Sequence, residues 1–119
     1  MTLQQIARSL DLTLLNPQVS YDLSREVGQA HASDLLSDVL ANAPGGGLLL
    51  TIQVHLNVIA VCLHAGLSAV VFTSGLTPEE AVREKAAAEG LPLFATREST
   101  FEAAGKLYAL GLRGRGRDG

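Results

Sequence analysis

Short apolar runs alternate with amphipathic segments from residue 47 onward. The runs at 47–51 (GLLLT), 68–72 (SAVVF) and 91–95 (LPLFA) are almost wholly apolar, as expected of parallel strands that are buried on both faces. Between the first two runs, the apolar residues of segment 54–65 recur at helical spacing. This part of the chain therefore predicts a repeated succession of strand and helix.

Residues that favour helix ends delimit the predicted helices. Gly66 is a suitable C′ residue for the helix over 54–65. Thr77 is followed by Pro78 and two glutamates, which predicts a helix with Thr77 as N-cap that runs to about residue 89. Ser99 opens the last predicted helix, which ends at Gly111.

The N-terminal part is more irregular. A Thr-Gln capping box predicts a helix over residues 3–9, and a brief strand over 12–15 ends at an Asn-Pro turn. A second strand over 27–32 leads to Ser33, the predicted N-cap of a helix that ends before the glycines at 45–47. Strands that alternate with helices imply right-handed crossover connections. The predicted fold class is α/β, a small sandwich with a mainly parallel sheet of about four to five strands flanked by helices.

Length and composition limit the organisation to a single domain. The 119 residues are 47% hydrophobic, enough for one core, so residues 1–112 are interpreted as one α/β domain and residues 113–119 as a flexible Arg/Gly tail. The tail carries a net charge of +2 and the chain −3, which leaves −5 for residues 1–112. An acidic body argues against nucleic-acid binding, although Arg/Gly alternation also occurs in disordered RNA-binding segments.

The expected location is cytoplasmic, and no membrane role is expected. Cys62 is the single cysteine, so no internal disulfide forms, and no basic segment followed by an apolar stretch precedes the domain. The longest apolar stretch, residues 58–72, is interrupted by His64 and Gly66 and is too short for a membrane span.

Polar residues follow the predicted strands at their carboxyl ends, where ligands bind in open parallel sheets. Arg97 is the cation among them and suits an anionic ligand, so a small anionic metabolite or nucleotide is the expected ligand. Ser and Thr at these places are also ordinary N-caps, which stabilise a helix without any ligand. The candidate ligand-binding residues are Ser33, Asp34, Thr51, Gln53, His55, Asn57, Thr73, Ser74, Gly75 and Arg97.

Catalytic and metal motifs are lacking. The chain has no GxxxxGK[ST] phosphate loop and no GxGxxG after a strand, and its histidines and cysteine lack metal-ligand spacing. His55 in a first helical turn and the carboxylates Asp34 and Asp38, four residues apart on one predicted helix face, leave a hydrolase or transferase as an outside alternative. Cys62 at core spacing is interpreted as a small buried residue, and His64 as a favourable partner of a helix C-terminus. No catalytic residue, metal or cofactor is predicted.

Several longer strings resemble the DRTGG domain family, specifically its small free-standing bacterial members. They are SDLLSDVLANA (33–43), LLLTIQVHLNVIAV (48–61), AVVFTSGLTPEE (69–80), GLPLF (90–94) and TFEAAGKLYALGL (100–112). The family takes its name from an Asp-Arg pair and a Thr-Gly-Gly. Here these are replaced by Ser33-Asp34 and by Thr51-Ile52-Gln53, so only Thr51 keeps the named identity.

The resemblance implies a non-catalytic regulatory module. Related domains are attached to phosphotransacetylases and CBS-containing pyrophosphatases, and they are similar in fold to the N-terminal domain of HPr kinase/phosphorylase. Ligand sensing with output to a second copy or a regulatory partner protein is the leading interpretation. The rival is a homodimerisation or adaptor module without a small ligand, which exposed apolar residues on the last helix such as Leu107, Tyr108 and Leu110 would favour.

Overall fold

A five-stranded sheet forms the middle layer of the computed structural model, which describes residues 1–116. In spatial order the strands are β1 (Thr13–Leu14), β5 (Leu93–Ala95), β4 (Ala69–Phe72), β3 (Leu48–Thr51) and β2 (Ala30–Ala32). The helices are α1 (Leu3–Ser9), α2 (Leu36–Asn42), α3 (Asn57–Ala65), α4 (Glu80–Ala88) and α5 (Thr100–Ala109). The predicted α/β class with a mainly parallel sheet is confirmed.

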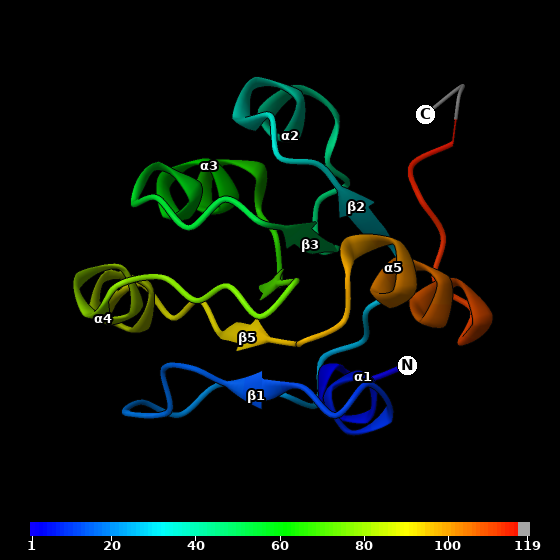
Figure 1. Ribbon diagram of the computed structural model, residues 1–119, viewed down its shortest axis with the longest axis horizontal. Coiled ribbons are helices and arrows are strands. Elements are labelled where there is room, and N and C mark those ends of the chain that lie inside the picture. Colours follow the sequence, from blue (N-terminus) through cyan, green and yellow to red (C-terminus); the bar gives the residue numbers. More distant parts are fainter. Residues whose placement is uncertain (117–119) are drawn as a thin grey trace.

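Strands β2 to β5 lie in chain order and are parallel, whereas β1 pairs antiparallel with β5. Because parallel crossovers are right-handed, connections that always step in one direction place their helices on one face. Figure 1 shows α2, α3 and α4 on one side of the sheet and α1 and α5 on the other. The chain thus changes face after β5.

Alternating strand residues separate the core into two clusters. Leu49, Val70, Phe72 and Leu93 pack with buried residues of α2, α3 and α4. Their neighbours in the strands face the other way and pack with α1 and α5, as expected from the period of two in a strand. This second set comprises Leu48, Leu50, Ala69, Val71 and Phe94, together with Leu3, Ile6, Ala103 and Leu107.

Three helix ends follow the sequence signals. The Thr2 hydroxyl accepts a hydrogen bond from the Gln5 N–H at 3.1 Å, which completes the predicted capping box. The Ser99 hydroxyl accepts from the Glu102 N–H at 3.1 Å, and Gly66 ends α3 in the left-handed region at φ 69°. No helix within residues 1–116 is long and apolar enough to cross a membrane.

Two predicted N-caps are wrong. Helix α2 begins at Leu36, and the Ser33 hydroxyl instead accepts from the Leu35 N–H at 3.2 Å in the preceding turn. Helix α4 begins at Glu80, and Thr77 lies in the loop before it. Pro78 is buried and its carbonyl accepts a 3.4 Å hydrogen bond from Arg83, so packing places this proline ahead of the helix.

Helix α3 also begins later than predicted, which moves His55 out of its first turn. The helix starts at Asn57, and His55 Nδ1 accepts a hydrogen bond from the Asn57 N–H at 3.1 Å. His55 therefore satisfies one of the free donors at the start of α3. His64 lies in the last turn of α3 and Cys62 is fully buried, both as predicted.

Strand β1 is held against β5 by a buried polar side chain. The Leu15 N–H donates to the Leu93 carbonyl at 2.8 Å, beyond the paired residues of β1. Next to it, the Asn16 carboxamide is fully buried, donates to the Leu91 carbonyl and accepts from the Leu93 N–H, both at 2.9 Å. Asn16 thus continues the pairing where the Asn-Pro turn was expected to end the strand.

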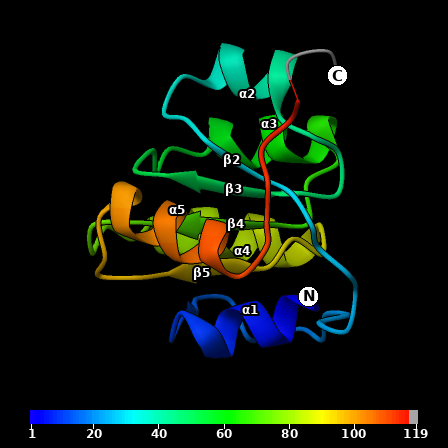
Figure 2. The same cartoon turned by 90° about the vertical axis from the view of Figure 1, so that its right-hand side faces the viewer.

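The first residues of the predicted tail contact the open edge of β2 (Figure 2). The Arg113 N–H donates to the Gly28 carbonyl and the Arg113 carbonyl accepts from the Ala30 N–H, both at 3.0 Å. The Arg113 guanidinium lies 3.7 Å from the ring centre of Tyr108, and Arg115 donates to the Ala41 carbonyl at 3.2 Å. Residues 117–119 of the predicted flexible tail lie outside the described residues.

Candidate functional site

The carboxyl ends of β4 and β5 form the switch point of the sheet. After β4 the chain turns to α4 on one face, and after the neighbouring β5 it turns to α5 on the other (Figure 1). Loops that leave adjacent strands toward opposite faces open a crevice between them, and ligands of open α/β sheets bind in such crevices.

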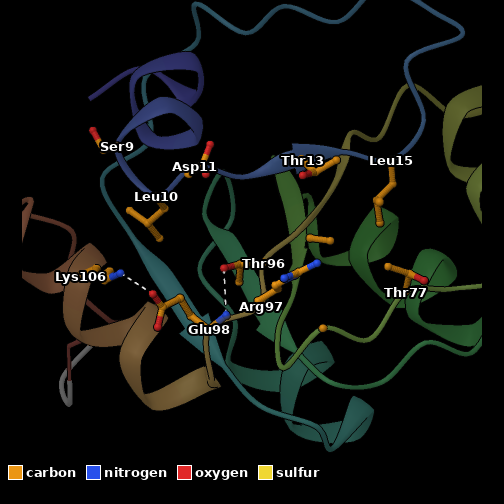
Figure 3. Close-up of a pocket in the computed structure, with 12 residues that line it drawn as sticks. Ser9, Leu10, Asp11, Thr13, Leu15, Thr77, Thr96, Arg97, Glu98 and Lys106 are labelled. Carbon is orange, nitrogen blue, oxygen red and sulfur yellow. Dashed lines mark hydrogen bonds and ion pairs between the residues drawn. The ribbon is translucent and has the colours of Figure 1, made fainter.

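A cavity of about 530 Å³ lies at this switch point. Its walls come from the loops after β4 and β5, from β1, from the end of α1 and from one residue of α5 (Figure 3). This volume lies within the range of small-molecule sites, which is roughly 300–1,000 Å³. The lining residues are Ser9, Leu10, Asp11, Thr13, Leu15, Gly75, Thr77, Ala95, Thr96, Arg97, Glu98 and Lys106.

Arg97 is the cation of this cavity that has no partner. Its side chain is exposed and makes no hydrogen bond or ion pair with any residue in the described part of the chain. Figure 3 shows its guanidinium directed toward the side of the cavity on which Leu15 and Thr77 lie. A guanidinium without a partner offers up to five N–H donors to an anion.

The second cation is already paired. Lys106 Nζ lies 2.6 Å from Glu98 Oε1, and this hydrogen bond raises the pKa of the Lys106 ammonium above its usual value. The Glu98 N–H donates to the Thr96 hydroxyl at 3.2 Å, which fixes the turn after β5. The Lys106 and Glu98 pair therefore closes one side of the cavity without a net charge.

The loop after β4 contains a tight turn that is hydrogen-bonded to the loop after β5. Ser74 and Gly75 have φ values of 62° and 72°, and the Leu76 N–H donates to the Thr73 carbonyl at 3.2 Å. These are the features of a type I′ turn, for which glycine at the second central position is favourable. The Ser74 N–H donates to the Glu98 carbonyl at 2.7 Å, and the Gly75 N–H to the Thr96 carbonyl at 3.0 Å. The two loops are thus held together, and these N–H groups are not available to an anion.

Asp11 ends α1 in a conformation that is unusual for a residue with a side chain. Its φ is 52°, its N–H donates to the Arg8 carbonyl at 3.2 Å, and the Leu12 N–H donates to the Ala7 carbonyl at 2.8 Å. This pattern is a Schellman motif with Asp11 at the C′ position, where glycine is usual. The motif places a carboxylate at the cavity wall.

A family model for the DRTGG domain matches residues 38–110, more than half of the chain. The chain belongs to the DRTGG domain family. The match runs from inside α2 to the end of α5 and confirms the family predicted from the sequence blocks. The walls of the cavity combine this region with Ser9, Leu10, Asp11, Thr13 and Leu15, which precede it.

The DRTGG fold is also evident from a solved structure. The chain is similar to the crystal structure of the CBS and DRTGG domains of the regulatory region of Clostridium perfringens pyrophosphatase, which is complexed with its activator, diadenosine tetraphosphate. The TM-score is 0.67 at 15% sequence identity, over 89% of this chain and 45% of that chain. A search of curated protein sequences gives no match.

The structure of this DRTGG domain does not bring the ten predicted ligand residues into one cavity. Gly75 and Arg97 line the switch-point cavity, and Ser74 lies in the turn beside it. Thr73 is fully buried, and its hydroxyl lies 2.6 Å from that of Thr100. The remaining six do not line this cavity: Thr51 ends β3, and Ser33, Asp34, Gln53, His55 and Asn57 follow β2 or β3.

Asp34 and Thr51 form a structural link between β2 and β3. Asp34 Oδ1 accepts hydrogen bonds from the Thr51 hydroxyl and from the Ile52 N–H, both at 2.9 Å. The Thr51 hydroxyl in turn accepts from the Gln53 N–H at 3.1 Å. Asp34 does not share a helix face with Asp38 as predicted, because α2 begins only at Leu36 and the Asp34 carboxylate bonds the end of the neighbouring strand.

The alternative of a hydrolase or transferase paired His55 with Asp34 or Asp38, but these side chains have other partners in the structure. Asp38 contacts His31 instead of His55, with 2.8 Å between Oδ2 and Nε2, and it accepts a 2.8 Å hydrogen bond from Asn42. Hydrogen bonds from Asn42, His31 and Ser33 lower the pKa of Asp38 to about 2. Asp34, Asp38 and His55 do not line the switch-point cavity. Residues 1–116 contain no cluster of three or more His, Cys, Asp or Glu side chains that could hold a metal ion.

Sequence reasoning missed most of the cavity wall. Thr96 and Glu98 continue the polar run that includes Arg97, and this run after a buried strand was a usable signal. Asp11 between two leucines was a second signal, because Asp is among the residues that tolerate the left-handed region. Thr13 and Leu15 gave no such signal, since only the pairing of β1 with β5 brings them to the site.

Proposed function

We propose that this DRTGG domain is a regulatory domain that senses a small anionic ligand in the switch-point cavity. The observation that carries the proposal is Arg97, a cation without a partner within residues 1–116, at the wall of a cavity between β4 and β5. Its hydrogen bonds to an anion would be charge-assisted, and such bonds are typically worth about 1.5–3 kcal/mol.

The known neighbour supports the regulatory role and the class of ligand. The pyrophosphatase segment of similar fold is a regulatory region, and its activator is a nucleotide with a chain of phosphates. Of the residues predicted from the sequence, Gly75 and Arg97 are retained in the proposed site. The proposed function is non-catalytic, which the regulatory role of the similar pyrophosphatase segment supports. The carboxylates of the cavity, Asp11 and Glu98, lie on the side opposite to the one that the Arg97 guanidinium faces (Figure 3).

A ligand-binding assay of the purified domain tests this proposal. Thermal shift and calorimetry are measured with inorganic phosphate, pyrophosphate, AMP and ATP as probes. A ligand at 100 times its dissociation constant raises the free energy of unfolding by about 2.7 kcal/mol. We expect Arg97→Gln to weaken binding at least about tenfold, since one charge-assisted bond exceeds the 1.4 kcal/mol that a tenfold change requires.

Arg25→Gln is the matched control, because it removes the same charge from an exposed arginine that does not line the cavity. It should retain the wild-type affinity. Equal losses in both variants would indicate a general charge effect and would contradict a site at Arg97. If none of the probes binds, the proposal that the cavity senses a small anionic ligand is wrong.

A protein-interaction module is the second candidate, and the exposed aromatic residues of α5 favour it. Phe101 is 85% exposed and Tyr108 is 61% exposed, seven residues apart and thus on one side of the helix. Of the residues expected on this surface, Leu107 is buried and Leu110 is half-buried, so both belong to the core.

A homodimer or a complex with a regulatory partner protein would use this side of α5. Light scattering across a concentration series tests the homodimer. A dimer that dissociates in Phe101→Ser but not in Val19→Ser, which removes an exposed apolar side chain elsewhere, would support it. A monomer at every concentration would exclude the homodimer and leave a complex with a partner protein as the interaction to test.

A further inference from the structure

The charged groups of the switch-point cavity are segregated. Arg97 points toward Leu15 and Thr77, whereas Asp11, Glu98 and Lys106 lie on the opposite side (Figure 3). The Lys106 and Glu98 charges compensate each other across their 2.6 Å contact. The cavity therefore presents a cationic group on one side and a carboxylate on the other.

Arg97 and Asp11 are the two charged side chains of the wall without a hydrogen bond or ion pair among the described residues. They do not satisfy each other. A ligand that satisfied both would carry an anionic group at one end and hydrogen-bond donors at the other. An inorganic anion would satisfy Arg97 alone, and the Asp11 carboxylate would repel it.

The backbone at Asp11 supports a role for its carboxylate. Its φ of 52° is a region that glycine adopts freely and that strains most other residues. The side chain makes no hydrogen bond or ion pair with another residue of 1–116. Asp is one of the residue types that tolerate this region, and residues in it are found at ligand-binding sites.

We infer that the cavity binds a phosphorylated sugar, free or as part of a nucleotide, with its phosphate at Arg97 and its hydroxyl groups at Asp11. This inference rests on the proposed ligand site and adds the class and the orientation of the ligand. A carboxylate accepts hydrogen bonds from two neighbouring hydroxyls, and acidic residues bind the ribose of dinucleotides in this way. Leu10, Leu15 and Ala95 supply the apolar wall against which the sugar ring or a base packs.

Calorimetry with ribose 5-phosphate, AMP and inorganic phosphate tests the inference on the wild type, Asp11→Asn and Arg97→Gln. Asparagine keeps the shape of Asp11 and tolerates its backbone conformation, so Asp11→Asn removes mainly the charge. We expect Asp11→Asn to weaken ribose 5-phosphate and AMP about tenfold, since a hydrogen bond to a charged group is worth at least 1.4 kcal/mol. The same variant should bind inorganic phosphate equally well or more tightly. Arg97→Gln should weaken all three probes.

Asp11→Gly provides a control for folding. Glycine suits φ 52°, so this variant should melt at a higher temperature than the wild type and still bind ribose 5-phosphate weakly. If AMP binds more tightly than ribose 5-phosphate, the ligand is a nucleotide. If the two bind equally tightly, the ligand is a free sugar phosphate.

Opposite outcomes separate the two proposals. If Asp11→Asn binds both sugar phosphates as well as or better than the wild type, while Arg97→Gln still weakens phosphate, the sugar orientation is wrong and the anion site stands. If Arg97→Gln leaves the affinity for all three probes unchanged, the proposed site itself is wrong.

Discussion

The carboxamide oxygen of Asn16 accepts a hydrogen bond from the Leu93 N–H at 2.9 Å, and its amide donates to the Leu91 carbonyl at the same distance. The two residues are 77 positions apart, and Asn16 is fully buried. A single side chain therefore fixes the N-terminal segment to the entry of β5. Because Thr13 and Leu15 precede it, the same contact positions one wall of the candidate site.

Replacement of Asn16 by alanine should destabilise the domain strongly. The change leaves the Leu93 N–H and the Leu91 carbonyl without partners, and each buried unsatisfied group is worth about 1–3 kcal/mol. We expect a loss of about 2–4 kcal/mol in the free energy of unfolding, measured by urea denaturation. Gln18→Ala, an exposed amide shortly after β1, is the control and should change stability little. A similar small change in Asn16→Ala would contradict the role of the carboxamide.

The link between Asp34 and Thr51 should appear as a coupling energy. Asp34 Oδ1 accepts from the Thr51 hydroxyl at 2.9 Å, so Asp34→Ala and Thr51→Val remove the same bond. We expect the double variant to be more stable than the sum of the single changes predicts, by about 1 kcal/mol. Urea denaturation of the four proteins gives this energy. Additive changes would show that the bond contributes nothing to stability.

Asp38 should make the domain sensitive to acid. The hydrogen bonds from Asn42, His31 and Ser33 lower its pKa from 3.8 to about 2 in the folded state. As the pH falls, the Asp38 carboxylate is therefore protonated in the unfolded chain before it is protonated in the folded domain. The contribution of Asp38 to the free energy of unfolding is lost between about pH 4 and pH 2. Above this range the contribution is fully present.

Urea denaturation from pH 5 to pH 2 measures this effect. Asp38→Asn should lack this part of the decrease in stability. Asn42→Ala keeps the Asp38 carboxyl but removes one of its hydrogen bonds. This variant should lose less stability between pH 5 and pH 2 than the wild type. Identical pH profiles for the wild type and Asp38→Asn would exclude the carboxylate as the source.

Cys62 should be unreactive in the folded domain. Burial raises the pKa of its thiol to about 12, whereas the thiolate is the reactive form. At pH 8 we expect a thiol reagent to modify Cys62 only as fast as the domain unfolds, and at once in denaturant. Rapid modification of the native protein would show that α3 opens locally.

The sequence predicts the layers of this fold better than its local details. The strands at Leu48–Thr51 and Ala69–Phe72 appear as predicted because they are buried on both faces, which gives a nearly continuous apolar run. The predicted starts of α2, α3 and α4 were too early: Ser33 and Thr77 have the side chains of N-cap residues but lie in the loops before α2 and α4, and His55 precedes α3. The partner of Asp34 lies on another strand, 17 residues away, and no local pattern indicates it.

The candidate site illustrates the same limit. Arg97 was predicted because it follows a strand in the chain, and the general rule for strand ends applies to it. Most of the other predicted residues follow β2 and β3, where successive helices stay on one face and no switch point forms. The change of face after β5 places α5 against β3 and β2, and no periodicity in the sequence reveals this packing.

The pairing of β1 with β5 affects how the domain is made. Thr13 lies opposite Ala95, so β1 cannot pair until residues 93–95 have also been synthesised. Domains fold as units, and the ribosome adds about 5–20 residues each second. The N-terminal helix therefore emerges several seconds before its docking surface exists, and β1 has no partner strand until β5 follows.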